Sequence, residues 1–206
     1  GLFGGHELAS TRKPNLNPQV LAALRFAYGQ EPSPEDVLHY IYAVLYAETY
    51  RQKYAEFLKT DFPRIPFTAD LGLFQSLAAL GKRLVDLHLL KSAELDPPLA
   101  RFQGQGDNRV GGNPGQGFRY EPAEERVYVN QGQYFAPVPV AAWEYQIGGY
   151  QVLEKWLKDR RERRLSLEEI KTYCRVVTAL QRTIAVQEEI DALYPAVEGQ
   201  AVVAAG

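Results

Sequence analysis

The sequence has no methionine and a single cysteine, Cys174, among its 206 residues. One thiol cannot form an internal disulfide and offers no metal-ligand spacing, so a disulfide framework and a cysteine-based zinc site are excluded. We expect a reducing, cytoplasmic setting. The missing initiator methionine indicates either a fragment or a chain without its modified methionines, and in both cases we expect catalytic parts elsewhere in the parent protein.

Long apolar runs are also absent. None approaches the roughly 18 residues that a membrane-spanning helix needs, and no basic start followed by an apolar stretch marks a secretory signal. The net charge is only −2, whereas DNA-binding modules often carry a basic excess. The near-neutral net charge argues weakly against DNA binding, but this argument is weaker if the cations gather on one face. Hydrophobic residues make up 46% of the chain, enough for a sizeable core.

Catalytic motifs are missing as well. No Gly-x-Gly-x-x-Gly or Walker A loop follows a strand pattern. The histidines are far apart, and His39 and His88 lie within helical apolar patterns, so we interpret both as structural residues. Asp159 and Glu169 superficially resemble the metal-binding carboxylates of nucleases, but capping of a helix explains Glu169. We therefore predict no catalytic residue and no metal site in this chain.

Capping residues and apolar spacing predict a mainly helical α+β fold, similar to a helical bundle, with a small β-hairpin or sheet. We expect one domain over residues 1–206. It would have a helical part at about 17–90, a glycine-rich loop and hairpin at about 91–136, and C-terminal helices at about 139–194.

Individual helices are bounded by recognisable signals. Asn17-Pro18 and Ser33-Pro34 are helix starts, and Gly29 ends the first helix. Ser166 opens a capping box with Glu169. The expected helices cover 18–28, 34 to about 60, 71–90, 139–145, 150–161 and a final helix from Ser166, after which the tail beyond Ala192 is expected to fray.

Between the helices the sequence indicates extended or irregular backbone. The two prolines in Phe62–Phe67 exclude a helix there. The glycine-rich stretch 91–125 predicts a long irregular loop. Residues 126–130 and 133–135 flank Gln131-Gly132 and predict a β-hairpin.

A basic run stands out near the predicted helix at 150–161. Its six cations outnumber its acids, Asp159 and Glu162, and phosphates reward such clusters through counterion release. A solvated helix end with favourable dipole contacts explains the run equally well. The cations are Lys155, Lys158, Arg160, Arg161, Arg163 and Arg164.

Aromatic and amide side chains lie beside this run. Gly148-Gly149 permits close backbone approach, and glutamine and arginine can read base edges in the major groove. Trp143 and Trp156 are interpreted mainly as core anchors. The glycine-rich loop also carries arginine, glutamine and asparagine, a composition that suits base readout and is equally ordinary for a surface loop.

Three stretches resemble a known family. They are PEDVLHYIYAVL at 34–45 with YRQKYAEFL at 50–58 and DFPRIP at 61–66, then GKRLVDLHLL at 81–90, then WEYQIGGYQVLEKWLKDR at 143–160. In order and spacing these are similar to the C-terminal specificity region of Type ISP restriction–modification enzymes, over about residues 14–192.

The resemblance implies a role within a larger polypeptide. Members of this family join a nuclease, a helicase-like ATPase, an adenine-N6 methyltransferase and a terminal target-recognition domain, and this chain resembles the last. The Asn/Asp-Pro-Pro-Tyr/Phe methyltransferase motif is absent, and Asn113-Pro114-Gly115-Gln116 is no substitute. We therefore expect S-adenosylmethionine, ATP and Mg²⁺ only in the upstream domains.

The expected partners are double-stranded DNA and the upstream methyltransferase and helicase-like domains of the same polypeptide, with no membrane. We expect base readout from variable loops, namely residues 101–120 and Phe62–Phe67. The alternative is a helical scaffold that docks those domains with little DNA contact. The candidate DNA-binding residues are Arg64, Lys82, Arg83, Arg101, Gln103, Asn108, Arg109, Arg119, Tyr145, Gln146, Gly148, Gly149, Tyr150, Lys155, Lys158, Arg160 and Arg161.

Overall fold

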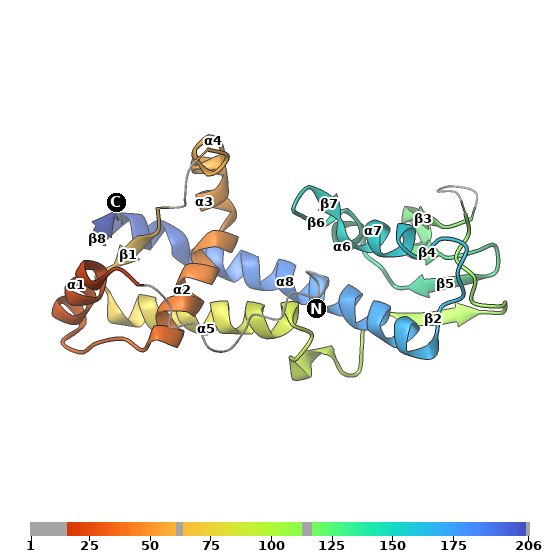
Figure 1. The fold of residues 1–206 in the computed structure, drawn as a ribbon, viewed down its shortest axis with the longest axis horizontal. Helices are drawn as coiled ribbons and strands as arrows, with labels where there is room; N and C mark the ends of the chain where they lie inside the picture. Colours follow the sequence, from red (N-terminus) through yellow and green to blue (C-terminus); the bar gives the residue numbers. More distant parts are fainter. Residues whose placement is uncertain (1–15, 61–63, 113–116, 205–206) are drawn as a thin grey trace. The chain divides into compact units, whose positions relative to one another are not determined.

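The computed structural model describes residues 16–60, 64–112 and 117–204. The fold is mainly helical with small antiparallel sheets, as predicted (Figure 1). The chain divides into two compact units. We call the unit that contains the described residues 87–112 and 117–184 the sheet unit, and the unit that contains the described residues 16–60, 64–86 and 185–204 the helical unit.

The first helix of the helical unit begins and ends where its capping residues predict. Helix α1 covers Pro18–Tyr28, and the Asn17 side chain accepts a hydrogen bond from the backbone of Gln19. Gly29 ends the helix in the left-handed conformation, with φ of 69°. The second start is equally clear, because Ser33 caps α2, Pro34–Tyr46, through the backbone N–H of Asp36.

The prediction of one helix from residue 34 to about 60 was wrong. The backbone is extended at Ala47, and two short helices follow, α3 at Glu48–Lys53 and α4 at Ala55–Leu58. Side chains far away in the sequence form hydrogen bonds with the backbone groups at the broken helix ends. Gln187 donates to the carbonyl of Tyr46, and Asp191 accepts from the backbone of Thr49. These partners lie about 140 positions away, so local sequence could not reveal the break.

Aromatic packing holds α2 to α5, Leu71–His88, and to strand β1, Pro66–Thr68. Tyr40 stacks on Phe67 and Phe74, and its hydroxyl donates to the carbonyl of Pro66. Tyr28 donates to the carbonyl of Thr68, and burial raises the pKa of Tyr28 to about 12. Each buried hydroxyl therefore has a partner, as burial of a phenol requires.

The C-terminal tail does not fray as expected. Helix α8 runs over Leu167–Gly199, and β8, Ala201–Ala204, pairs antiparallel with β1. Tyr194 and Val197 are fully buried beyond Ala192. The small apolar residues of the tail thus form a strand whose partner, β1, lies far earlier in the sequence.

The sheet unit contains a four-stranded antiparallel sheet in the order β2-β5-β4-β3. Its strands are β2 at Arg101–Gly104, β3 at Arg119–Glu121, β4 at Arg126–Tyr128 and β5 at Gln133–Ala136. The pairing of β4 with β5 confirms the predicted hairpin. The prediction of an irregular loop was wrong at β2 and β3, because these segments are strands that pair with the hairpin. The two strands are short and carry little apolar alternation, so the sequence did not reveal them.

Smaller elements connect the sheet to its covering helices. Single 3-10 turns occur at Ala93–Leu95 and Pro122–Glu124. Helix α6 covers Val140–Glu144 and α7 covers Val152–Lys158. The helix predicted from residue 150 begins later and ends earlier, because Tyr150–Gln151 forms strand β7, which pairs with β6, Gln146–Ile147.

The core of the sheet unit gathers buried side chains from the inner face of the sheet and from the helices α6, α7 and α8. Phe135 contacts Phe102 and Tyr173, with ring centroids 4.7 and 4.3 Å apart. The buried members are Ala100, Val110, Phe118, Val127, Val129, Phe135, Val138, Ala142, Leu153, Leu157, Leu165, Tyr173, Cys174, Val176, Val177 and Leu180.

The predicted capping box of α8 is present. The backbone of Glu169 donates to Ser166 Oγ at 3.1 Å, and the backbone of Ser166 donates to Glu169 Oε2 at 3.0 Å. Arg160 and Arg163 also donate to this carboxylate. The Ser166 hydrogen bond and these two arginines lower the pKa of Glu169. Within the described residues, no helix is long and apolar enough to cross a membrane.

Gly81 lies where α5 meets α2, and this contact generates a stability prediction. A Cβ atom at Gly81 would lie 1.8 Å from the backbone carbonyl oxygen of His39. We expect Gly81→Ala to destabilise the protein by about 1–3 kcal/mol, because one helix must move. At Gly72, on the same helix, the nearest atom is a side-chain oxygen of Asp70 at 3.2 Å. Thermal unfolding followed by circular dichroism should leave Gly72→Ala near wild type, and equal stability of the two variants would contradict this packing.

The capping box predicts a pH-dependent contribution to stability. The pKa of Glu169 is lower in the folded state, so its charge stabilises the fold above the unfolded pKa of about 4.3 and stops doing so as pH falls through the folded pKa. Glu169→Gln keeps the capping oxygen but loses the charge. We expect it to be less stable than wild type at pH 7, by roughly 1 kcal/mol or less, and the difference to shrink as the pH falls below the unfolded pKa and through the folded pKa. Tryptophan fluorescence during urea unfolding measures this, since Trp143 and Trp156 both lie in the sheet unit. A difference that persists unchanged at pH 3 would contradict the assignment.

Candidate nucleic-acid interface

The outer face of the four-stranded sheet carries a continuous row of polar and aromatic side chains. Register places Gln103 opposite Tyr134, Tyr134 opposite Tyr128, and Tyr128 opposite Arg119. Side chains alternate along a strand, so the burial of Phe135 and Val127, with the partly buried Phe102 packed against them, directs this row away from the core. We call Arg101, Gln103, Arg119, Arg126, Tyr128 and Tyr134 the outer sheet face.

Arginines lie flat on the tyrosines of this face. The guanidinium carbon of Arg119 lies 4.1 Å from the ring centroid of Tyr128, and that of Arg126 lies 4.2 Å from the ring centroid of Tyr134. Arg126 also contacts Glu124 at 2.7 Å and the Tyr128 hydroxyl at 3.0 Å. Stacking fixes each guanidinium plane and leaves its N–H edges for other partners.

The two other arginines of the outer sheet face have no ion-pair partner among the described residues. No carboxylate of residues 16–60, 64–112 or 117–204 lies within 4.0 Å of Arg101 or Arg119. Arg101 is exposed and Arg119 is half-buried. Their positive charge is therefore not neutralised by a direct contact within this part of the chain.

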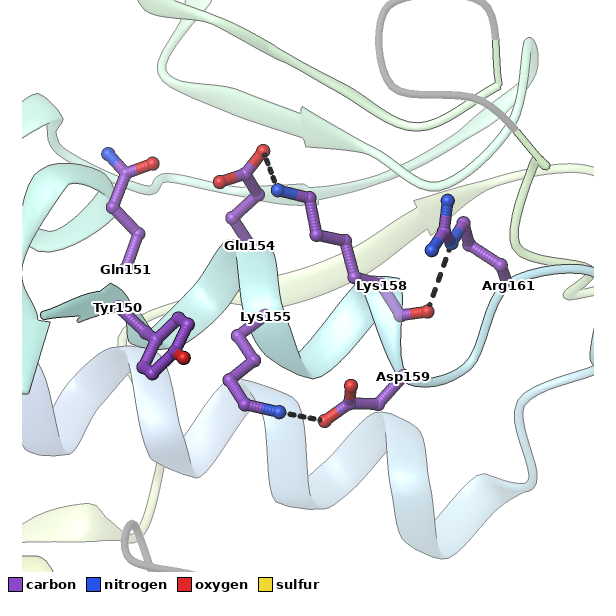
Figure 2. A pocket seen from close by; sticks show the side chains of 7 residues that line it. All are labelled: Tyr150, Gln151, Glu154, Lys155, Lys158, Asp159 and Arg161. Carbon is purple, nitrogen blue, oxygen red and sulfur yellow. Dashed lines mark hydrogen bonds and ion pairs between the residues drawn. The ribbon is translucent and has the colours of Figure 1, made fainter. Parts of the chain in front are cut away.

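A second candidate surface lies on α7 (Figure 2). It surrounds a shallow pocket of about 280 Å³ lined by Tyr150, Gln151, Glu154, Lys155, Lys158, Asp159 and Arg161. Ion pairs join Lys155 to Asp159 at 2.7 Å and Lys158 to Glu154 at 3.0 Å. Arg161 donates to the carbonyl of Lys158 at 3.2 Å. The carboxylates of α7 thus offset most of the charge of its lysines.

Most of the remaining basic run is occupied by contacts within the sheet unit. The guanidinium of Arg160 lies 3.6 Å from the ring centroid of Trp156 and donates to Glu169 at 3.1 Å. Arg163 also pairs with Glu169, and Arg164 pairs with Asp107 at 3.4 Å. The sequence count of this run included neither of these acids, because the fold brings Asp107 to the run and Glu169 reaches back to it from the start of α8.

Asn108 and Arg109 lie in the loop after β2. Gln133, which is 4% exposed, donates to the Asn108 side chain at 2.8 Å and accepts from the Asn108 backbone at 2.8 Å. These bonds tie the Asn108 amide to the buried end of β5. Arg109 is exposed and forms an isolated bridge with Arg164 through the backbone.

The β6–β7 hairpin presents the predicted diglycine at its turn. Gly148 and Gly149 have φ of 61° and 82°, and no atom lies within 4 Å of a Cβ added at either position. Gln146 is exposed and Tyr150 is 63% exposed, whereas Tyr145 is half-buried. The positive φ values suit a tight two-residue turn that glycine adopts without strain.

Both tryptophans pack against the core as predicted. Trp143 stacks on Tyr120, and Trp156 contacts Tyr173 with ring centroids 4.9 Å apart. Their indoles therefore serve the fold of the sheet unit.

The structure assigns the other candidates to the helical unit. Arg64 is exposed and lies near the Phe57 ring, Lys82 pairs with Asp86 at 2.6 Å, and Arg83 pairs with Glu189 at 3.1 Å. Phe62 and Pro63, and residues 113–116 of the expected reading loop, lie outside the described residues.

Sequence reasoning missed Arg126, Tyr128 and Tyr134. Their alternation with the buried Val127 and Phe135 was visible, but which strand would complete the face depended on pairings with β2 and β3. Among the described residues there is no group of three or more His, Cys, Asp or Glu side chains that could hold a metal ion. The absence of a metal site from the chain stays a prediction.

Residues 3–189 match the family model of the Type ISP C-terminal specificity domain. No curated protein matches the chain.

Three solved structures are similar in fold. A nuclease-deletion mutant of the Type ISP restriction-modification enzyme LlaGI in complex with a DNA substrate mimic has a TM-score of 0.57 at 23% identity, covering 78% of this chain and 14% of that one. The DrdV–DNA complex has a TM-score of 0.61 at 22% identity, covering 86% and 19%. The ATP-dependent Type ISP enzyme LlaBIII bound to DNA has a TM-score of 0.60 at 20% identity, covering 85% and 12%.

This chain therefore spans less than a fifth of the length of those three chains. At these identities the likeness concerns the fold, while the family model covers nearly all of the sequence. The match over residues 3–189 confirms the resemblance found in the sequence, and the chain belongs to the Type ISP C-terminal specificity domain family.

Proposed function

We propose that this chain recognises a duplex DNA target as the specificity domain of a restriction–modification enzyme. The family match over residues 3–189 carries the proposal. The three similar solved structures support it, since each is described as a complex with DNA or with a DNA substrate mimic.

Charge distribution in the sheet unit supports duplex binding despite a net charge of −2. Among the described residues, the arginines without a carboxylate within 4.0 Å include Arg101, Arg109, Arg119 and Arg161. Each can contact a phosphate without first breaking an ion pair, and each such contact releases counterions from DNA. Local charge, rather than net charge, then decides binding.

The proposed role is recognition without catalysis. DNA cleavage, ATP hydrolysis and adenine methylation, with Mg²⁺, ATP and S-adenosylmethionine, are assigned to other domains of a longer polypeptide. The short span of this chain relative to LlaGI, DrdV and LlaBIII supports that division.

Exposed apolar side chains in the helical unit favour an additional docking role toward those domains. Phe26 on α1 is 93% exposed and Leu38 on α2 is 51% exposed. Burial of two such side chains at a domain interface would be favourable by a few kcal/mol, on the order of 1.5–3 kcal/mol each. If docking is their role, Phe26→Asp with Leu38→Asp should lower cleavage by the complete polypeptide while the DNA affinity of this chain stays unchanged.

Selection from random duplexes tests the recognition function directly. The chain is incubated with duplexes that carry a randomised centre, and the bound fraction is sequenced over several rounds. We expect one motif to be enriched and to bind roughly 10³-fold more tightly than a scrambled duplex at physiological salt.

The control for this selection is the same chain with its fold confirmed by circular dichroism after the binding steps. A folded chain that enriches no motif and binds no duplex at 50 mM salt would contradict the recognition function, because phosphate contacts are strongest at low salt.

A further inference from the structure

We infer that the outer sheet face, and not the basic surface of α7, is where this chain contacts duplex DNA. The inference rests on the proposed function and assigns it to six residues. Arg101 and Arg119 would contact the duplex, and Tyr128 would act as a positioning residue beneath Arg119.

Ion pairing separates the two surfaces. On α7, Lys155 and Lys158 each pair with a carboxylate one helical turn away, at 2.7 and 3.0 Å. A phosphate at either lysine would have to displace that carboxylate and then face it. Arg161 is the exception on this surface, because it donates to a backbone carbonyl and has no carboxylate partner among the described residues. On the outer sheet face, Arg101 and Arg119 have no such partner among the described residues, although Arg126 pairs with Glu124 and Glu121 lies opposite Arg126 on the same face. A phosphate can therefore reach Arg101 and Arg119 without displacing a carboxylate.

The position of the arginines argues for a duplex over a single strand. Single-strand binders stack bases on open aromatic rings. Here Arg119 covers the Tyr128 ring at 4.1 Å and Arg126 covers the Tyr134 ring at 4.2 Å. The tyrosines are thus used to hold guanidinium planes, whose N–H pairs match the paired acceptors of a phosphate or a guanine edge.

The size of the row also suits a duplex. Gln103 and Arg119 stand at opposite edges of a four-stranded sheet, three strand spacings apart. At about 4.8 Å per spacing, the row is about 14 Å long. The major groove is about 12 Å wide, so the two ends of the row are far enough apart to contact both strands that border it.

The two surfaces look out from different sides of one core. Leu153 and Leu157 of α7 are buried in the same cluster as Val127 and Phe135 of the inner sheet face. The outer sheet face therefore points away from α7. Binding at one surface therefore does not require the other, and the two assignments can be tested separately.

Two double variants remove equal charge from the two surfaces. The first is Arg101→Ala with Arg119→Ala, and the matched control is Lys155→Ala with Lys158→Ala, because both lysines are ion-paired with carboxylates. Binding to a mixed-sequence 30-base-pair duplex is measured by fluorescence anisotropy over a salt series, with tryptophan fluorescence confirming that each variant is folded. We expect the first pair to lose at least about tenfold in affinity and about 1.8 in the salt slope, and the control to lose less than about twofold.

The positioning role of Tyr128 is tested by two further substitutions. Tyr128→Phe keeps the ring beneath Arg119, whereas Tyr128→Leu removes it. We expect Tyr128→Phe to bind like wild type, and Tyr128→Leu to lose about as much affinity as Arg119→Ala, with an unchanged unfolding midpoint for the sheet unit.

The outcomes distinguish this inference from the proposed function. Loss of binding in the α7 pair, with retention in the sheet pair, overturns the inference and leaves duplex recognition intact. Tighter binding to one strand of the same 30-mer than to the duplex also overturns it. If the folded wild-type chain binds no duplex at all, the proposed function fails.

Discussion

The contact of Phe135 with Phe102 and Tyr173 is the interaction on which the sheet unit depends. These rings lie 4.7 and 4.3 Å from Phe135 and fix the inner face of the sheet against α8. A shift of one residue in register would turn every side chain of a strand to the other face. Burial of Phe135 therefore also determines that Tyr134, and with it Tyr128 and Arg119, point outward. The core packing and the direction of the outer sheet face therefore both follow from one strand register.

A near-neutral chain can still bind a polyanion if its ion pairs are unevenly distributed. In the sheet unit, five of the six cations of the basic run pair with nearby carboxylates, and Arg160 also stacks on Trp156, so that Arg161 alone of the run lacks a carboxylate partner among the described residues. The outer sheet face keeps arginines that lack such partners among the described residues. Surface ion pairs contribute only about 0–1 kcal/mol each, so their main effect here is on where a phosphate is attracted rather than on stability.

Local signals in the sequence predicted local structure well. The caps at Asn17, Ser33 and Ser166 begin helices where their side chains and the following residues indicated. The break at Ala47 could not be predicted in this way, because Asp191 and Gln187 supply the hydrogen bonds at the broken helix ends. The strand β8 could not be predicted either, because it forms only by pairing with β1. Each depends on residues more than 130 positions away.

The candidate site was predicted only in part for the same reason. The cations of the basic run are contiguous in sequence and were easily found, but their partners Asp107 and Glu169 are not all neighbours. Arg101, Gln103 and Arg119 were identified as candidates, whereas the row that joins them exists only once β5 and β4 lie between β2 and β3. Composition indicates which side chains can read DNA, and strand order decides which of them share a surface.

The most direct test of this account is a structure of the chain bound to a duplex that carries its selected motif. The account predicts DNA atoms within hydrogen-bonding distance, about 3 Å, of the Arg101 and Arg119 guanidinium groups, with Tyr128 still beneath Arg119. A duplex lying across Lys155, Lys158 and Arg161, with the outer sheet face open to solvent, would contradict it.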